Sequence, residues 1–157
     1  MTQIELTQAA REYLIGGHAV MIATVEPDGT PYTSVVGSCV VVPSGRLRFA
    51  AWGAGRTLQD IRRSGRASAV TLGDDLVWSI TGSAAVIKDP MKSSAFPPHP
   101  YVMVEITPEG TENLLGDRKA QRLIHQYSGK RVEQRTQYRD ELLAELKTYD
   151  PAGQDNP

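Results

Sequence analysis

The feature that most constrains the fold is residues 46–66, where a strand pattern gives way directly to a helix pattern. The first part, RLRFAAW, places Leu47, Phe49 and Ala51 on one face, which is typical of a strand with one buried face. After two glycines the spacing of the apolar residues lengthens to that of a helix. The stretch therefore predicts a strand, a glycine loop and a short helix in immediate succession.

We expect this short helix to begin at Thr57 and to end at Gly65. Thr57 and Asp60 have the spacing of a capping box, and a glycine tolerates the positive φ that ends many helices. The free amides of a helix N-terminus, preceded here by Arg56, bind either a phosphate or only water. The loop lacks the third glycine of a dinucleotide-binding fingerprint, which excludes a Rossmann fold.

Strand patterns separated by turn residues occupy most of the chain up to residue 106. The turn sequences at 26–29 and 43–45 join the first three strands into an antiparallel meander, and the one at 107–110 ends the last strand. Gly82, inside the long fifth strand, indicates a bend or bulge that lets a sheet curl. We therefore expect a mainly β fold, a closed or split antiparallel β-barrel with flanking helices. Its six strands are expected at residues 18–25, 31–42, 46–52, 67–72, 76–88 and 101–106.

Helical patterns flank the strands at both ends of the chain. The pattern of residues 7–15 predicts a short helix that Gly16 and Gly17 stop, and that of residues 117–126 predicts another. Residues 131–149 carry an apolar stripe that packs either on the barrel or across a partner subunit. We expect a single domain over residues 1–150 and a disordered polar tail over residues 151–157. The apolar stripe consists of Tyr138, Leu142, Leu143 and Leu146.

Size and charge exclude several classes of protein. A chain of 157 residues corresponds to about one domain, and its net charge of −1 gives no overall attraction to nucleic acid. No apolar run reaches the roughly 20 residues that cross a bilayer, and the first residues lack a signal-peptide pattern. The single cysteine cannot form an internal disulfide. We therefore expect a cytoplasmic protein without nucleic-acid or membrane partners. Its local basic cluster either borders an anionic small molecule or is solvated, and consists of Arg56, Arg62, Arg63 and Arg66.

No pattern of side chains identifies a catalytic acid, base or nucleophile. The histidines His18, His99 and His125 lack the spacing of metal ligands, so no metal site is expected, and haem ligation by one of them stays open. Cys39 lies within a strand pattern, as a small buried apolar group does. Ser34 has no companions in the order of a catalytic triad.

Four segments occur in a fixed order along the first half of the chain: ATVEPDGTPYTSVVG at 23–37, RLRFAAW at 46–52, LQDIRRSGRASAV at 58–70 and WSITGSAAVI at 78–87. Together they resemble the FMN-binding split-barrel family, also called pyridoxamine 5′-phosphate oxidase-like. The resemblance implies a homodimer with FMN at the subunit interface and an oxidoreductase that acts on an unidentified small molecule. The alternatives on the same fold are a non-catalytic flavin, deazaflavin or haem binding or storage protein, and a deazaflavin-dependent reductase.

The resemblance also implies the cofactor contacts. The segment at 33–36 would line the isoalloxazine ring, the segment at 50–52 would border the ribityl chain, and Arg56 with the start of the helix would hold the phosphate. Family members commonly carry a lysine or arginine three residues before an asparagine in this helix, where this chain has Thr57 and Asp60. Trp78 either stacks near the flavin or belongs to the core. The expected cofactor-binding residues are Thr33, Ser34, Val35, Val36, Ala50, Ala51, Trp52, Arg56, Thr57 and Trp78.

Overall fold

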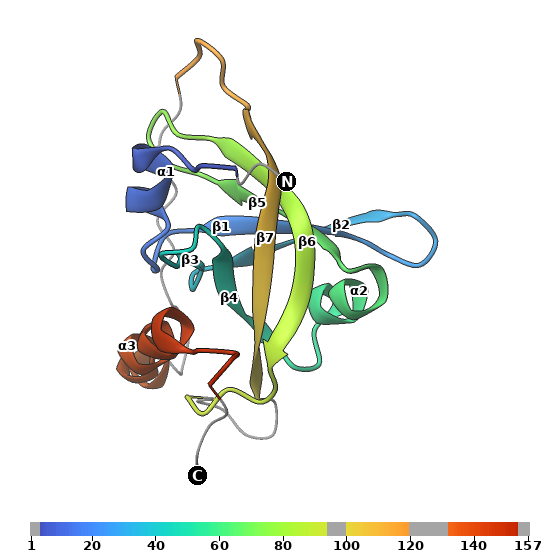
Figure 1. The fold of residues 1–157 in the computed structure, drawn as a ribbon, viewed down its shortest axis with the longest axis vertical. Coiled ribbons are helices and arrows are strands. Elements are labelled where there is room, and N and C mark those ends of the chain that lie inside the picture. Colours follow the sequence, from blue (N-terminus) through green and yellow to red (C-terminus); the bar gives the residue numbers. More distant parts are fainter. Residues whose placement is uncertain (1–3, 94–99, 120–131, 154–157) are drawn as a thin grey trace.

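The computed structural model describes residues 4–93, 100–119 and 132–153, with the side chains of the last helix from residue 139 onward. A seven-stranded antiparallel sheet curls around the centre of the molecule, in the order β2-β1-β5-β6-β7-β4-β3 (Figure 1). The expected split-barrel architecture, mainly β with flanking helices, is confirmed. The strands are β1 (Val20–Val25), β2 (Pro31–Val36), β3 (Val40–Val41), β4 (Leu47–Trp52), β5 (Arg66–Thr71), β6 (Trp78–Lys88) and β7 (Tyr101–Asn113). The helices are α1 (Gln8–Tyr13), α2 (Arg56–Ser64) and α3 (Val132–Thr148).

The segment expected as one strand over residues 31–42 forms two strands, so the sheet has seven strands instead of six. β2 pairs with β1, whereas β3 pairs with β4, and the expected meander of the first three strands is therefore wrong. Hydrogen bonds outside the ladder hold the break: the Gly37 carbonyl accepts from the Gly17 amide at 2.7 Å, and the Ser38 hydroxyl accepts from the Ala50 amide at 3.1 Å. β2 and β3 consequently lie at opposite edges of the sheet.

The last strand, β7, continues past the turn expected at residues 107–110. It pairs with β6 through a register shift between Thr81 and Gly82 that sets Gly82 opposite Pro108. A Cβ atom at Gly82 would lie 1.9 Å from the Thr107 carbonyl oxygen, so this close approach requires glycine. The predicted bulge at Gly82 is confirmed. The predicted strand end is wrong because the bulge accommodates a proline that has no amide hydrogen for the ladder.

An apolar core fills the curl of the sheet beneath α1 and α2. The Thr7 hydroxyl caps α1 by accepting from the Ala10 amide at 3.2 Å. Gly16 and Gly17 follow the helix with φ of 95° and 90°, as the sequence predicts. No helix of the described segments is long and apolar enough to cross a bilayer. The largest fully buried side chains of this core are Leu14, Val20, Ile22, Leu47, Phe49, Leu58, Ile61, Ile80 and Ile106.

The C-terminal helix α3 packs on the barrel of its own chain, which is one of the two placements expected from the sequence. Leu142 and Leu146 lie in an apolar cluster with Val40, Ala50 and Met103. Figure 1 shows α3 and α2 on opposite sides of β4. The helix expected over residues 117–126 lies outside the described residues beyond 119, as do the Tyr138 side chain and the end of the expected tail beyond 153.

Candidate functional site

An open cleft of about 760 Å³ lies where β2, β4 and the start of α2 come together. Its volume is in the usual range for small-molecule and cofactor sites, roughly 300–1,000 Å³. Tyr101 of β7 and Leu142 of α3 also line it. The structure brings most of the predicted cofactor residues to this one cleft, namely Ser34, Val35, Val36, Ala50, Ala51, Trp52, Arg56 and Thr57.

Two of the predicted cofactor residues, Thr33 and Trp78, do not line the cleft. Thr33 lies on β2 between Tyr32 and Ser34, which both line the cleft. Trp78 begins β6, where it is half-buried and pairs with Asn113. Eight of the ten predicted cofactor residues therefore line one cleft, and their contact with a cofactor stays a prediction.

The helix α2 begins at Arg56, one residue before the predicted start, and Gly55 is its N-cap without a side-chain hydrogen bond. The predicted capping box is absent because both of its side chains have partners elsewhere. The Thr57 hydroxyl shares a hydrogen bond of 2.9 Å with the Ser34 hydroxyl, and Asp60 accepts from Thr24. The first-turn amides are therefore left without a capping side chain, and the residues at this helix start line the cleft.

Asp60 of α2 does not line the cleft. Its side chain is buried, its carboxylate accepts a hydrogen bond of 2.8 Å from the Thr24 hydroxyl on β1, and its Oδ1 lies 3.8 Å from Nη2 of Arg63. The carboxylate that replaces the family's usual asparagine is thus compensated by groups of this chain.

Arg56 is the one charged side chain among the described residues that line the cleft. Its Nη1 lies 3.2 Å from Oε1 of Glu26, its Cζ lies 4.9 Å from the centre of the Tyr32 ring, and its side chain is 57% exposed. An ion pair this exposed contributes about 1 kcal/mol or less, so a ligand's anionic group can replace the Glu26 carboxylate. The other arginines of the basic cluster form ion pairs outside the cleft, namely Arg62, Arg63 and Arg66.

The remaining candidates from the sequence do not enter the cleft. His18 has Nδ1 2.8 Å from the Tyr13 carbonyl oxygen and stacks on the Tyr13 ring, while His99 and His125 lie outside the described residues. Cys39 is buried, and burial raises the pKa of its thiol to about 12, which keeps it protonated and unreactive. In the described part of the chain no cluster of three His, Cys, Asp or Glu side chains is suited to a metal ion.

Two residues of the cleft, Tyr101 and Leu142, carry no local signal for this role in the sequence. Both lie far along the chain from β2, β4 and α2, and each reads as an ordinary apolar position of a strand or helix. The one indication in the sequence is the apolar stripe in residues 131–149, which predicts that this helix packs on another part of the protein but does not identify that part.

Comparison with known proteins gives one family and several similar folds. The family model for pyridoxamine 5′-phosphate oxidase matches residues 6–115, most of the chain but not α3. HupZ from Group A Streptococcus has a TM-score of 0.60 at 18% identity, over 74% of this chain and 99% of that one. An F420 reductase has a TM-score of 0.56 at 18% identity, over 69% of this chain and 99% of that one. The conserved hypothetical protein Rv2991 from Mycobacterium tuberculosis has a TM-score of 0.53 at 17% identity, over 83% of this chain and 96% of that one. No curated protein matches the chain.

Proposed function

The chain belongs to the pyridoxamine 5′-phosphate oxidase-like family of split barrels, and on that premise we propose that it is an FMN-binding oxidoreductase acting on a small molecule. The observation that carries the proposal is the convergence of Arg56, the start of α2 and the Ser34–Thr57 hydroxyl pair on one side of the cleft. Helix amides, a guanidinium and hydroxyls are the donors that suit a dianionic phosphate.

The other walls of the cleft also fit FMN. Ala50 and Ala51 of β4 have small side chains that leave space for a ribityl chain and a flat ring. At Gly55 a Cβ atom would lie 3.0 Å from the Trp52 carbonyl oxygen, so glycine lets the loop close tightly just before the first-turn amides. When bound, FMN supplies hydride transfer at its isoalloxazine ring.

The chain's own residues would bind FMN, orient its ring and shield it from water. Arg56 and the hydroxyl of Thr57 would hold the phosphate, and the amides of the first turn of α2 would add donors directed at it. Val36 and Ala51 would restrict the ring to the space between β2 and β4. No side chain is assigned as a catalytic acid or base.

We also propose that a second copy of the chain completes the cleft as a homodimer. Val35 and Trp52 line the cleft, yet 58% of Val35 and 50% of Trp52 are exposed in the single chain. Large apolar side chains exposed around an open site are typical of an interaction surface. A partner subunit that covers them would exclude water from the cofactor.

Titration with FMN, followed by flavin fluorescence, tests the proposal on wild type, Arg56→Ala and Arg62→Ala. Arg62 is the matched control because it lies on the same helix with 49% of its side chain exposed, but outside the cleft. We expect one FMN per chain, an affinity about tenfold lower for Arg56→Ala, equal to about 1.4 kcal/mol, and no change for Arg62→Ala.

No binding by wild type at micromolar FMN would refute the proposal. Parallel titrations with F420, a deazaflavin, and with haem would then show whether the cleft takes one of these instead. Sedimentation equilibrium of the purified protein tests the dimer, and a monomer at all concentrations would refute that part.

A further inference from the structure

The helix α3 lines part of the cleft, although it lies beyond the segment that the family model matches. Its residue Leu142 lines the cleft together with Ala50 of β4 and Tyr101 of β7, and is 8% exposed. Leu142, Ala50 and Tyr101 also belong to the apolar cluster through which α3 packs on the barrel. The docking of α3 and the closure of this part of the cleft therefore depend on the same side chains.

The buried side chains of α3 are separate from the main core of the barrel. In the described part of the chain, the core cluster inside the curl of the sheet contains no residue of α3. Leu142 and Leu146, the two buried side chains described for α3, pack instead in a second cluster with Val40, Met91 and Met103. An element with few buried apolar side chains opens at a lower free energy than the core does. Undocking of α3 would thus uncover the second cluster and leave the main core intact.

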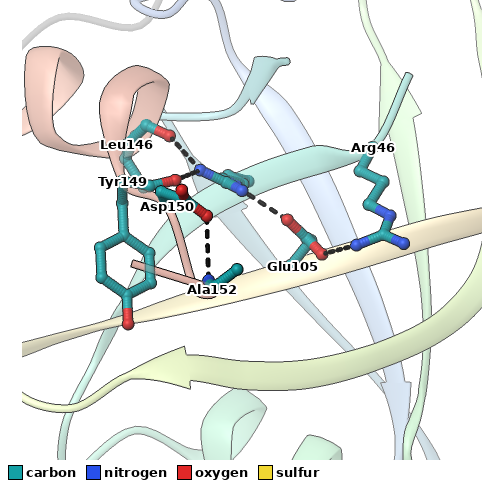
Figure 2. Close-up of polar contacts among 7 residues, drawn as sticks. Arg46, Glu105, Leu146, Tyr149, Asp150 and Ala152 are labelled. Carbon is teal, nitrogen blue, oxygen red and sulfur yellow. Dashed lines mark hydrogen bonds and ion pairs between the residues drawn. The ribbon is translucent and has the colours of Figure 1, made fainter. Parts of the chain in front are cut away.

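A cation from β4 holds the C-terminal end of α3 against the barrel. The Arg48 guanidinium donates from Nε to Oε2 of Glu105 at 2.8 Å and from Nη1 to the carbonyl oxygens of Leu146 and Tyr149. Figure 2 shows Glu105 between Arg46 and this end of the helix. Carbonyl groups at a helix C-terminus lack partners within the helix, and a positive charge suits the negative end of the helix dipole. Arg48 therefore favours the docked position of α3.

A second set of contacts joins the same end of α3 to β6 and to the segment after it. Glu145 lies 3.1 Å from the Lys88 ammonium, and each of these two side chains is 11% exposed. The carboxylate of Glu145 also accepts hydrogen bonds of 2.7 Å from the backbone amides of Lys92 and Ser93. The Lys88 ammonium lies 4.8 Å from the centre of the Tyr149 ring. These polar contacts are all made around the C-terminal end of α3, so they break together when the helix undocks.

We propose that α3 is a lid on the cleft: it undocks from β4 as one unit while the barrel stays folded, and its docked position retains the bound ligand. When α3 undocks, Leu142 leaves the cleft, and the surface at Ala50 and Tyr101 opens to solvent. A ligand that contacts Leu142 binds the docked state better and shifts the population toward it, and by the same linkage weaker docking lowers the affinity for the ligand. The undocking stands on the contacts of α3, and only the identity of the ligand as FMN rests on the proposed function.

Native-state hydrogen exchange of the full chain, measured by mass spectrometry without ligand and with FMN, tests the lid. Ile80→Val weakens the main core, because Ile80 of β6 is fully buried there. Glu145→Gln weakens the docking of α3. Glu141→Gln is its matched control, because it removes the same charge from an exposed position of the same helix that does not line the cleft.

Without ligand, the amides of α3 should exchange about tenfold or more faster than those of β4 and β7. Ile80→Val should speed exchange in the strands about fivefold and leave α3 unchanged, since the main core stays intact when only α3 opens. Glu145→Gln should speed exchange in α3 about tenfold, because it removes hydrogen bonds to a charged group, whereas Glu141→Gln should follow wild type. FMN should slow exchange in α3, and Glu145→Gln should bind FMN more weakly than Glu141→Gln does.

Two results without ligand would overturn the inference: equal acceleration of α3 and the strands in Ile80→Val, which would mean that α3 opens only when the whole protein unfolds, or the same exchange in Glu145→Gln and Glu141→Gln. With FMN bound, unchanged exchange in α3 and equal affinities of the two glutamate variants would refute the lid and leave the proposed function standing. Failure of wild type to bind FMN would refute the proposed function, and the exchange measured without ligand would still decide whether α3 undocks.

Discussion

Replacing Arg48 by alanine should destabilise the protein far more than replacing Arg46, although both arginines bind the carboxylate of Glu105. The side chain of Arg48 is 8% exposed and that of Arg46 is 48% exposed. Only Arg48 also donates to the carbonyl groups at the end of α3, Leu146 and Tyr149. The two substitutions therefore remove the same charge from environments that differ in burial and in the number of groups left without a donor.

The magnitudes follow from these contacts. Breaking a buried ion pair costs about 3–5 kcal/mol. We expect Arg48→Ala to cost about 3 kcal/mol, the lower end of that range, because Arg46 still balances Glu105. Arg46→Ala should cost about 1 kcal/mol or less, as exposed pairs do. Replacing Arg48 by methionine and Glu105 by leucine together should cost less than Arg48→Ala, because no charge is then left buried.

Urea unfolding at neutral pH, followed by far-ultraviolet circular dichroism, gives the free energy of unfolding of wild type and of the three variants. Losses for Arg48→Ala and Arg46→Ala that agree within about 0.5 kcal/mol would refute the reasoning, since exposed pairs contribute only about 0–1 kcal/mol. A double replacement that costs more than Arg48→Ala would show that the ion pair itself stabilises the fold. This result would contradict our argument that Arg48→Ala is costly because it leaves a charge buried.

Three further outcomes are expected. Gly82→Ala should cost about 3 kcal/mol in urea unfolding because its Cβ would lie 1.9 Å from the Thr107 carbonyl oxygen, and a loss under about 1 kcal/mol would mean that the bulge relaxes easily. Burial raises the pKa of Glu145, but hydrogen bonds from Ser93 and its neighbours outweigh burial and hold that pKa below the ordinary 4.5. The stabilisation that Glu145 contributes is therefore present above about pH 4.5 and is lost as the pH falls through the lower pKa of the folded state. In Glu145→Gln the free energy of unfolding should consequently fall less steeply with decreasing pH than in wild type. Identical pH dependence of this free energy in the two proteins would contradict the assignment. Because burial raises the pKa of Cys39 from 9.0 to about 12, iodoacetamide should label the native protein about a thousandfold more slowly than the unfolded chain, and equal rates would show that the thiol is accessible.

Local patterns predicted the fold wherever a segment's own residues decide its structure. The strand β4 and the left-handed Gly65 at the end of α2, with φ of 64°, form where the local pattern predicts them. The prediction of a single buried face on β4 is wrong, because α3 also covers the face that carries Arg48 and Ala50. The predictions failed where a distant partner decides. β7 continues through Pro108 because Gly82, on another strand, forms the bulge that receives it.

The same distinction separates the two halves of the candidate site. The resemblance of residues 20–88 to a family indicated Ser34, Arg56 and Thr57, which the fold does bring together. The capping box failed because the Thr57 hydroxyl binds Ser34 of β2 instead of its own helix. Leu142 could not be assigned because its place in the cleft depends on α3 docking to β4, which residue spacing in the helix does not specify.

The contacts of Arg48 have a consequence for how the chain folds as it is synthesised. They join residues that lie 98 and 101 positions apart, so they cannot form until residue 149 has left the ribosome. The barrel segment is made first and must wait with the surface around Val40 and Met103 uncovered, because α3 is what buries it. A nascent or truncated chain of this kind presents an apolar surface to chaperones and to other copies of itself. We therefore expect that only a chain translated through the end of α3 buries this apolar surface and is released by chaperones.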